Sequence, residues 1–435
     1  MGLAWLALVV FYSLGAVSAT REMWPYSQVL AAWQFVAGHP EERTTLWKKI
    51  MNDTGVKPLR HTVTLGPKAH PVSAYAALDG LPLKSERDPP LVYLGAGAPK
   101  GFRIIFGVFD FKESLHGAIL LDPNGKVQNT WQITQNDLPW PHEPDHLIFP
   151  RGFEVTRDGS IIVAYDGGNS LTKYDYCGRK RWQVEGGFHH SVELFDEETF
   201  WVWGNIKSQE TYGTELMQMS VEDGSIIRTI GILDIIRANP DSDILEIRQI
   251  DTESGANWAK DPLHRNDIDA LREELAGLYP GFAAGDLLVS MRSINLVFVL
   301  DPENLDIKWW RVGLARRQHD PDWNARGTIT IFNNNMHRGY SSIVEVGPQT
   351  MERRILVDGA DYDFYSRIRG KHQELPDGSF LITSSGQGRV FEVAPDGTVT
   401  FDFHNPFSEE HGALSVSEAR FLPPGYFQEL PTCED

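Results

Sequence analysis

Cysteine is scarce in this chain of 435 residues, which contains only Cys177 and Cys433. Two thiols exclude a disulfide-rich scaffold and a zinc cage made of cysteines, and leave one bridge open in an oxidising compartment. The chain also lacks any run of five or more Lys or Arg, and its formal net charge is −19. This acidity argues against nucleic acid or an anionic lipid surface as a partner, because both would repel the protein.

Long apolar runs are equally rare. One spans residues 3–19 and ends in Val17-Ser18-Ala19, small residues of the kind that precede a signal-peptidase cut. The run is short for a membrane span, and no Lys or Arg precedes it. We therefore expect residues 1–19 to be a signal peptide or an uncleaved N-terminal membrane anchor, and the protein to be exported to the periplasm or another extracytoplasmic space.

What the sequence does contain is an internal repeat from about residue 100 onward. Each unit combines a short strand, an Asp-Gly turn, a β-branched strand, a Gly-rich break and further strands with a final Trp or Phe. The clearest unit contains Asp158-Gly159, the apolar stretch 161–163 and Trp182. Six such units can be laid over one another, at residues 104–131, 153–182, 191–230, 264–310, 319–357 and 377–401.

Six units of about four short strands each predict an all-β fold, a six-bladed β-propeller over residues 100–407. A short mixed α/β lead-in, residues 20–99, precedes it, with a helix expected from Met23 to about Gly55. Residues 408–435 are expected to form a C-terminal tail. The insertion at residues 269–278 predicts a short helix that projects from one face.

Histidines stand near the start of several units, where the innermost strand of a propeller blade lines the central channel. They are His189, His190, His264, His319 and His372. Arg292 lies within an apolar strand, so its charge must meet water, an anionic ligand or a carboxylate such as Asp267 or Asp301. One Arg and several His form a set of donors suited to a tetrahedral oxyanion such as sulfate, and imidazole can also act as nucleophile or general base.

Six short segments share an order and a position within these units. They are 264–266 (HRN), 290–292 (SMR), 318–320 (QHD), 327–334 (GTITIFNN), 373–378 (QELPDG) and 405–406 (NP). Together they resemble the bacterial, nucleotide-independent arylsulfotransferase family over about residues 100–407. Members of that family are six-bladed propellers that move a sulfuryl group from a phenolic sulfate ester to another phenol.

The resemblance implies a role for each matching residue. His319 is the nucleophile that becomes transiently sulfated, Arg292 and His264 bind the sulfuryl oxygens, and Asn266 orients a neighbouring His. The family's first-blade His falls on the pair His189-His190 and is best matched by His190.

Further residues are expected to contact the ligands. Asn266, His189 and His372 are candidate substrate-binding residues, although the resemblance implies no role for His372. The expected partners are a small aryl sulfate donor and a phenolic acceptor, without cofactor or metal. No Gly-x4-Gly-Lys-Ser/Thr loop exists for a nucleotide sulfate donor.

Three other interpretations remain open. A ring of histidines can hold Ca²⁺, Zn²⁺ or Cu²⁺, although the positive charge of Arg292 would repel a metal ion. The turn at residues 122–126 and Trp131 are similar to features of quinone-cofactor propellers, which have eight units rather than six. A propeller that binds a sulfated ligand without turnover is the third.

Overall fold

The computed structural model describes residues 56–57, 70–85, 87–140, 148–206, 215–245, 263–336, 338–408, 412–430 and 432–433. All of them belong to one unit, Gly55–Asp435. The expected signal or anchor segment, residues 1–19, and the expected helix at 23–55 lie outside the described residues.

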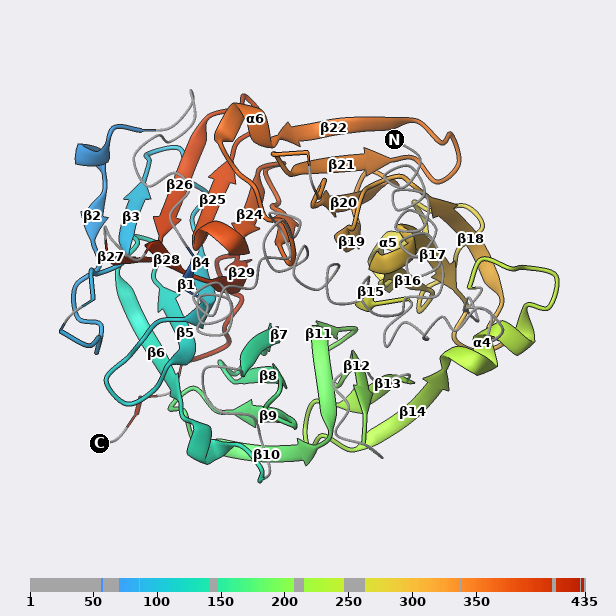
Figure 1. The fold of residues 1–435 in the computed structure, drawn as a ribbon, viewed down its shortest axis with the longest axis horizontal. Coiled ribbons are helices and arrows are strands. Elements are labelled where there is room, and N and C mark those ends of the chain that lie inside the picture. Colours follow the sequence, from blue (N-terminus) through green and yellow to red (C-terminus); the bar gives the residue numbers. More distant parts are fainter. Residues whose placement is uncertain are drawn as a thin grey trace, which may run out of the picture. The chain divides into compact units, whose positions relative to one another are not determined.

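Six antiparallel sheets are arranged like the blades of a wheel around a central axis, which confirms the predicted six-bladed β-propeller (Figure 1). Blade one contains β29 (Val416–Leu422), β4 (Phe102–Val108), β5 (His116–Leu121) and β6 (Val127–Ile133). Blade two contains β7 (Phe149–Val155), β8 (Ile161–Asp166), β9 (Ser170–Tyr174) and β10 (Lys180–Glu185). Blade three contains β11 (Gly187–Leu194), β12 (Thr199–Asn205), β13 (Glu215–Ser220) and β14 (Ile226–Gly231).

The other three blades repeat this order. Blade four contains β15 (Arg265–Ala270), β16 (Leu287–Met291), β17 (Leu296–Leu300) and β18 (Ile307–Val312). Blade five contains β19 (His319–Trp323), β20 (Ile329–Asn333), β21 (Ser342–Val346) and β22 (Arg353–Asp358). Blade six contains β23 (Lys371–Glu374), β24 (Phe380–Ser384), β25 (Arg389–Val393) and β26 (Val399–His404), and β3 (Leu91–Leu94) and β2 (Ala76–Ala77) extend it outward.

The innermost strands β29, β7, β11, β15, β19 and β23 contact one another in a closed ring, which is the hub of the wheel. The ring closes because β29, from the C-terminal segment 408–435, pairs with β4 of the first unit. Sequence analysis placed this segment outside the propeller, since a single strand far from its partners carries no repeat signal. Just before β29 in the chain, β27 (Pro406–Ser408) and β28 (Gly412–Leu414) form a small separate sheet with β1 (Val56–Lys57).

The core consists of six apolar layers, each between two neighbouring blades. Alternation along β4 shows how one strand serves two of them: Ile104 and Phe106 pack toward blade two, whereas Ile105 packs toward blade six. The two-residue period of a strand sends successive side chains to opposite faces, so both faces must be apolar when both are covered. Each fully buried large side chain contributes about 1.5–3 kcal/mol.

The repeated tryptophan of the last strand joins neighbouring blades. The indole nitrogen of Trp131 donates to the carbonyl of Asp175 (2.9 Å), that of Trp182 to Val221 (3.1 Å), and that of Trp309 to Pro348 (3.1 Å). In each case the acceptor lies in or beside a turn of the next blade. Burial of the ring together with a satisfied N–H explains why an aromatic residue recurs at this place.

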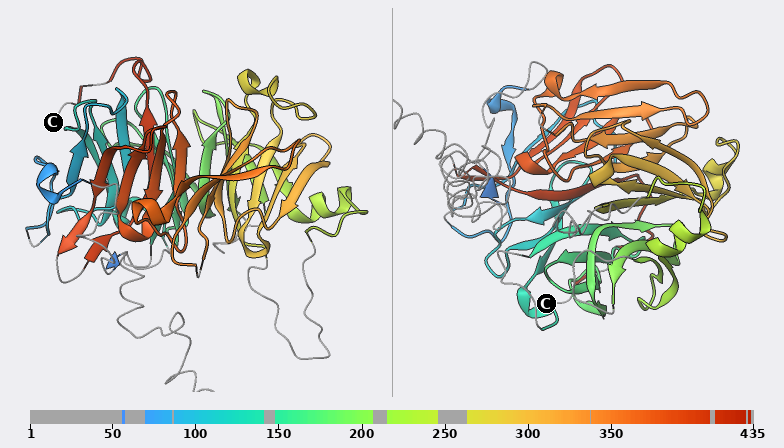
Figure 2. Two further views of the ribbon diagram at one scale, coloured as in Figure 1. Left: turned by 90° about the horizontal axis from the view of Figure 1, so that it is seen from above. Right: turned by 45° about the vertical axis from the view of Figure 1, so that its right-hand side comes forward.

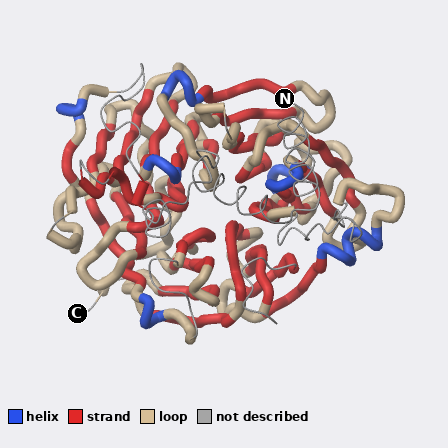
Figure 3. Tube along the Cα trace, viewed as in Figure 1, coloured by secondary structure: helices blue, strands red, loops and turns tan. Residues whose placement is uncertain are grey.

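Helices are few among the described residues and lie outside the strands of the blades (Figure 3). They are α4 (Ile232–Ala238), α5 (Glu273–Ala276), α6 (Gly359–Tyr362) and the short 3-10 turns η1 (Val72–Ala74), η2 (Gln135–Asp137), η5 (Arg292–Ile294) and η6 (Ser385–Gln387). Helix α5 occurs in the predicted insertion and projects from one face of the wheel (Figure 2), but it begins later than expected because Asp269 still belongs to β15. Within the described ranges, no helix has the length and apolar character needed to span a membrane.

A disulfide joins Cys177, which follows β9, to Cys433 near the end of the chain, across a sequence separation of 256 residues. The two cysteines therefore pair with each other, a possibility that the sequence left open. A cross-link over so long a loop removes much of the conformational freedom of the unfolded chain and is worth about 2–5 kcal/mol.

Candidate functional site

Five of the six innermost strands have a register irregularity at the same station, near the end of the hub where they begin. The shifts lie between Pro150 and Gly152, His189 and Val192, Arg265 and Asp267, His319 and Pro321, and Val416 and Glu418. A β-bulge leaves one residue outside the ladder and re-aims its side chain. The hub thus has re-aimed residues near one end, and the predicted site residues His190 and Asn266 are among them.

Left-handed backbone conformations accompany these bulges. His190, His264 and Asp320 have φ values of 57°, 48° and 53°. Such a conformation costs a residue other than Gly on the order of 1 kcal/mol or more, so the surrounding fold must hold it in place. Strain of this kind at one station of three blades is typical of a functional site.

Four of the predicted histidines meet at this level of the hub. The imidazole of His190 lies at the centre of the group, with ring centroids 4.9 Å from His189, 5.1 Å from His264 and 6.0 Å from His319. They come from β11, from the residue before β15 and from the first residue of β19. The Nε2 atom of His190 is buried and has no hydrogen-bond partner among the described residues, so it is available to a ligand.

His319 is held by Asn334, which follows β20. The Nδ1 atom of His319 lies 2.7 Å from Oδ1 of Asn334. The amide nitrogen of Asn334 donates to the carbonyls of Ser366 (2.8 Å) and Arg369 (2.5 Å), so the amide oxygen must be the atom that faces His319. An oxygen can only accept, and therefore Nδ1 of neutral His319 carries the proton and Nε2 carries the lone pair.

Asn266 joins blade four to the segment before this histidine, and the backbone of Arg292 binds within blade four. The backbone N–H of Arg292 donates to the carbonyl of His264 (2.9 Å), and the side-chain nitrogen of Asn266 donates to the carbonyl of Gln318 (2.7 Å), the residue before His319. Asn266 thus positions the backbone beside His319, whereas the side-chain partner of His319 is Asn334. The two acids considered as structural partners of Arg292 bind lysines instead: Asp267 pairs with Lys371 (2.9 Å) and Asp301 with Lys308 (2.9 Å).

Burial and neighbouring cations keep the histidines neutral. The pKa of His319 is well below its ordinary value, first because the side chain is buried and then because of the charge of Arg292. Burial also lowers the pKa of His189 and His190, with further lowering by Arg265 and Arg151 for His189 and by Arg151 for His190. Near neutral pH the site therefore offers unprotonated imidazoles surrounded by guanidinium groups, which suits an anionic ligand.

His372 is not part of this group. Its Nδ1 atom lies 2.8 Å from Oδ2 of Asp320, and its ring packs against Phe380. Sequence analysis placed it with the other histidines because it also stands near the start of a unit. It is the second residue of β23, however, and its side chain lies beside Asp320 and Asp322 of the carboxylate layer described next.

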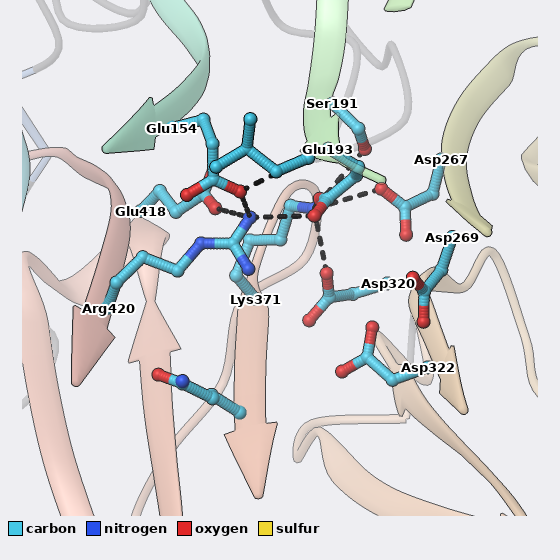
Figure 4. A network of polar contacts seen from close by, with 12 residues as sticks. Glu154, Ser191, Glu193, Asp267, Asp269, Asp320, Asp322, Lys371, Glu418 and Arg420 are labelled. Carbon is cyan, nitrogen blue, oxygen red and sulfur yellow. Dashed lines mark hydrogen bonds and ion pairs between the residues drawn. The ribbon is translucent and has the colours of Figure 1, made fainter. Parts of the chain in front are cut away.

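A layer of carboxylates crosses the hub and is linked by ion pairs to two basic residues (Figure 4). It consists of Glu154, Glu193, Asp267, Asp269, Asp320, Asp322 and Glu418, one or two from each of five innermost strands. The sixth strand supplies Lys371, whose Nζ contacts Glu193 (2.7 Å), Asp267 (2.9 Å) and Asp320 (2.8 Å). Arg420 binds Glu193 (2.8 Å) and Glu418 (2.7 Å).

The seven carboxylates are thus opposed by two cations within this network. Burial raises the pKa of Asp269 to about 7 and that of Glu418 to about 8. It also raises the pKa of Glu154, Asp267 and Asp322. Burial works against ionisation of Glu193 and Asp320 too, but the charges of Arg420 and Lys371 outweigh it, and the pKa of both is lowered. Two carboxylates therefore carry charge opposite the two cations, and the others retain protons to higher pH than usual.

Groups that could hold a metal ion occur in this layer within the described part of the chain. They are Asp320 with Asp322 and His372, and Glu193 with Asp267 and Asp320. The ammonium of Lys371 already lies within 2.9 Å of all three carboxylates of the second group, where a metal ion would have to bind. The four clustered histidines, in contrast, have arginines as neighbours, and positive charge there opposes a metal ion.

Two residues and the layer of carboxylates were not predicted from the sequence. Asn334 was part of a matched segment but had no role, because its partner His319 lies on another strand. Arg151 occupies the bulge station of blade two, where aligning the units would have placed it beside the histidines. The alternating acids of 267–269 and 320–322 were visible as Asp-x-Asp pairs, whose shared face in a strand is the signal that could have found the carboxylate layer.

Several solved structures are similar to this chain at low sequence identity. A protein of unknown function from Bacteroides caccae is 11% identical, with a TM-score of 0.47 over 74% of this chain and 98% of that one. Hydrazine synthase from Kuenenia stuttgartiensis is 14% identical (TM-score 0.41; 75% and 81% covered), and virginiamycin B lyase from Staphylococcus aureus is 10% identical (TM-score 0.34; 60% and 72% covered). At these values the likeness indicates nothing about function.

Sequence comparison is more informative. No curated protein matches the chain. The model of the family described as Arylsulfotransferase (ASST), however, matches residues 152–406, which is more than half of the chain and reaches from blade two to the end of blade six. The matched range contains the four histidines of the hub, Arg292 and Asn334. The chain therefore belongs to the arylsulfotransferase family and is a sulfotransferase enzyme acting on small aryl sulfates and phenols.

Proposed function

We propose that the enzyme transfers a sulfuryl group from a phenolic sulfate ester to a phenolic acceptor through a sulfohistidine on Nε2 of His319. The observation that carries this proposal is the contact of His319 Nδ1 with Asn334 Oδ1 at 2.7 Å. It places the proton on Nδ1 and leaves the Nε2 lone pair free to attack. The lowered pKa of His319 supports the same role, since a nucleophile must be unprotonated.

The first half-reaction balances as a displacement at sulfur. Nε2 of His319 forms a bond to sulfur while the bond from sulfur to the aryl oxygen breaks and its electron pair leaves with the phenolate. The phenolate leaves as an anion toward the guanidinium groups of the hub and takes its proton from water. In the second half-reaction an acceptor phenol loses its proton to neutral His190, whose ring centroid lies 6.0 Å from that of His319, and attacks sulfur. The bond from sulfur to Nε2 breaks and releases neutral His319, and His190 then gives the proton to water.

The charges of the hub favour binding of an anion beside the histidines. Arg292 influences His319, and Arg151 and Arg265 influence His189, so guanidinium groups surround the imidazoles. Arg292 and His264 would bind the sulfuryl oxygens, whose charge spreads in the transition state. Further along the axis Lys371 and Arg420 already bind Glu193, which favours binding and release of the sulfate at the mouth.

The experiment is a pre-steady-state reaction of the purified enzyme with 4-nitrophenyl sulfate in the absence of acceptor. We expect a burst of one nitrophenolate per enzyme and a sulfated peptide that contains His319 in the mass spectrum. Addition of phenol should then restore the unmodified peptide. The matched control is His70→Gln, since His70 bonds to the carbonyl of Val399 (2.7 Å) away from the hub.

Two results would contradict the proposal. If His319→Ala retains the burst, the nucleophile is another residue or water. If the wild-type enzyme binds the aryl sulfate but neither cleaves it nor becomes modified, the chain is a binding protein that has kept the fold of its family.

We also propose that the enzyme acts in an exported location, the periplasm or another oxidising compartment, with residues 1–19 as signal peptide or membrane anchor. The Cys177–Cys433 disulfide supports this, because such bonds persist in oxidising compartments. In protein alkylated directly in intact cells, both cysteines should resist the reagent until they are reduced. Free thiols in freshly made protein would argue for a reducing compartment.

A further inference from the structure

Two arginines that the proposed mechanism does not use lie at the mouth of the hub beside the histidines. Arg151 occupies the bulge of β7. It follows that Arg151 sits against blade three, because the next residue, Gly152, packs so closely that a Cβ there would lie 2.0 Å from the carbonyl oxygen of His190. Only Gly permits this approach of β7 to β11, and it brings the Arg151 backbone next to His190.

Arg369 approaches the same region from blade six. Its carbonyl accepts the bond from Asn334, the residue that holds His319. Its guanidinium carbon lies 4.5 Å from the ring centroid of Phe149 on β7, so the side chain reaches across the hub to a blade that is not its neighbour. A left-handed backbone at Arg369, with φ of 62°, precedes Gly370 and directs the chain into β23.

Positive charge exceeds negative charge at this pair. Arg151 binds Asp166 at 2.5 Å, whereas no carboxylate of the described residues forms an ion pair with Arg369. The Nε atoms of both arginines are buried and have no hydrogen-bond partner among the described residues. Burial and then the charge of Arg151 lower the pKa of Arg369 to about 9. Asp166 acts on Arg369 only from a distance and is already bound by Arg151, so a guanidinium with a buried Nε and no ion pair of its own among the described residues is costly unless an anion completes the site.

We propose that Arg151 and Arg369 form a second anion-binding subsite, which binds an acidic substituent on the aromatic ring of the sulfate donor or the phenolic acceptor. The substituent is a carboxylate or a group of similar charge and geometry, which can form paired bonds with a guanidinium. Phe149 supplies an apolar surface beside the pair for the aromatic ring. This inference rests on the proposed function, because it names the class of substrate that the histidine site receives.

The test compares neutral and carboxylated substrates, with the rate of each corrected for the leaving-group ability of its phenolate by a series of neutral aryl sulfates. Donors are phenyl sulfate and 4-sulfooxybenzoate, and acceptors are phenol and 4-hydroxybenzoate. We expect the wild-type enzyme to prefer the carboxylated member of at least one pair by about tenfold or more in kcat/KM, the worth of a charge-assisted hydrogen bond. The donor and acceptor pairs show separately which substrate carries the acidic group.

In Arg369→Gln this preference should fall by about tenfold, and Arg369→Lys should restore part of it because the charge returns without the planar fork. Arg237→Gln is the matched control, since Arg237 lies on α4, is exposed and pairs only with Asp234 among the described residues. The inference is overturned if the wild-type enzyme shows no preference, or if Arg369→Gln lowers kcat/KM equally for neutral and carboxylated substrates, which would place the arginine on the transferred sulfuryl group instead.

A binding experiment separates this inference from the proposed function. In His319→Ala, calorimetric titration with 4-sulfooxybenzoate and phenyl sulfate measures recognition without turnover. Tighter binding of the carboxylated ester that is lost in the double variant with Arg369→Gln supports the subsite even if the enzyme transfers no sulfuryl group. Equal binding of both esters, together with equal binding of phenol and 4-hydroxybenzoate, refutes it whatever the activity is.

Discussion

Replacement of Asn334 by Ala tests how the structure prepares His319 for attack. The side chain makes three hydrogen bonds, one from His319 Nδ1 (2.7 Å) and two to the carbonyls of Ser366 and Arg369 (2.8 and 2.5 Å). Without its oxygen, His319 can rotate and can move its proton to Nε2, which removes the nucleophilic lone pair. Loss of a group that orients a reacting imidazole costs about 10- to 100-fold, and we expect kcat to fall by this amount.

The same replacement leaves buried polar groups without partners. Each unsatisfied group costs about 1–3 kcal/mol, so stability must be measured beside activity. Asn333→Ala is a matched control because Asn333 is also buried and also makes three bonds, to Ser342 Oγ (3.1 Å) and from the N–H groups of Arg316 (2.8 Å) and Asn335 (3.1 Å), but none to His319.

The assay is steady-state transfer from 4-nitrophenyl sulfate to phenol, together with thermal unfolding of both variants. We expect both to lose stability, but only Asn334→Ala to lose kcat by more than tenfold at a temperature where each variant is folded. The reasoning is refuted if the two variants lose activity equally, or if Asn334→Ala keeps the wild-type kcat.

Three further predictions concern charge in the hub. Because burial and Arg292 lower the pKa of His319, the acid limb of the kcat/KM profile should lie below pH 6.5, the ordinary value for His; a limb above it would contradict a neutral buried nucleophile. Lys371→Met leaves carboxylates without their counter-charge and should lower the free energy of unfolding by about 3–5 kcal/mol, measured with denaturant; a neutral effect would show that the carboxylates are already protonated. The folded-state pKa of Glu418 is raised from 4.5 to about 8, so its contribution to stability is present below pH 4.5 and is lost as the pH rises through 8. The melting temperature should therefore fall over that rise, less so in Glu418→Gln, and an equal fall in both proteins would exclude this residue as the cause.

The fold was predictable because a blade is a local object. Each unit places its turns, alternating strands and final aromatic residue within a few tens of residues, as Asp158-Gly159 and Trp182 show in blade two. The period of two along a strand and the Gly of a tight turn are properties of short segments. Repetition then implies the wheel, since a blade cannot cover its own two apolar faces.

The site was predictable only where it followed the repeat. His190, His264 and His319 stand in or near the bulges of their innermost strands, and any ring of blades brings similar stations together. His372 stands at about the same place in its unit, but β23 has no bulge there, and its ring meets Asp320, the residue that the bulge of β19 leaves outside the ladder. A shift of two residues along a strand is small in sequence, yet it moves a side chain to the next level of the hub.

By itself, then, the sequence determined the six blades, the strand that carries each histidine and membership in a family that transfers sulfuryl groups. Only the tertiary structure decided that β29 closes the ring, that Asn334 orients His319 and that Arg369 reaches across the hub to Phe149, two residues before Arg151. The physical reason is the distance along the chain between the residues that interact. Strands and turns arise from contacts between near neighbours in the chain, whereas bulges, proton positions and buried charges depend on what the opposite side of the hub presents.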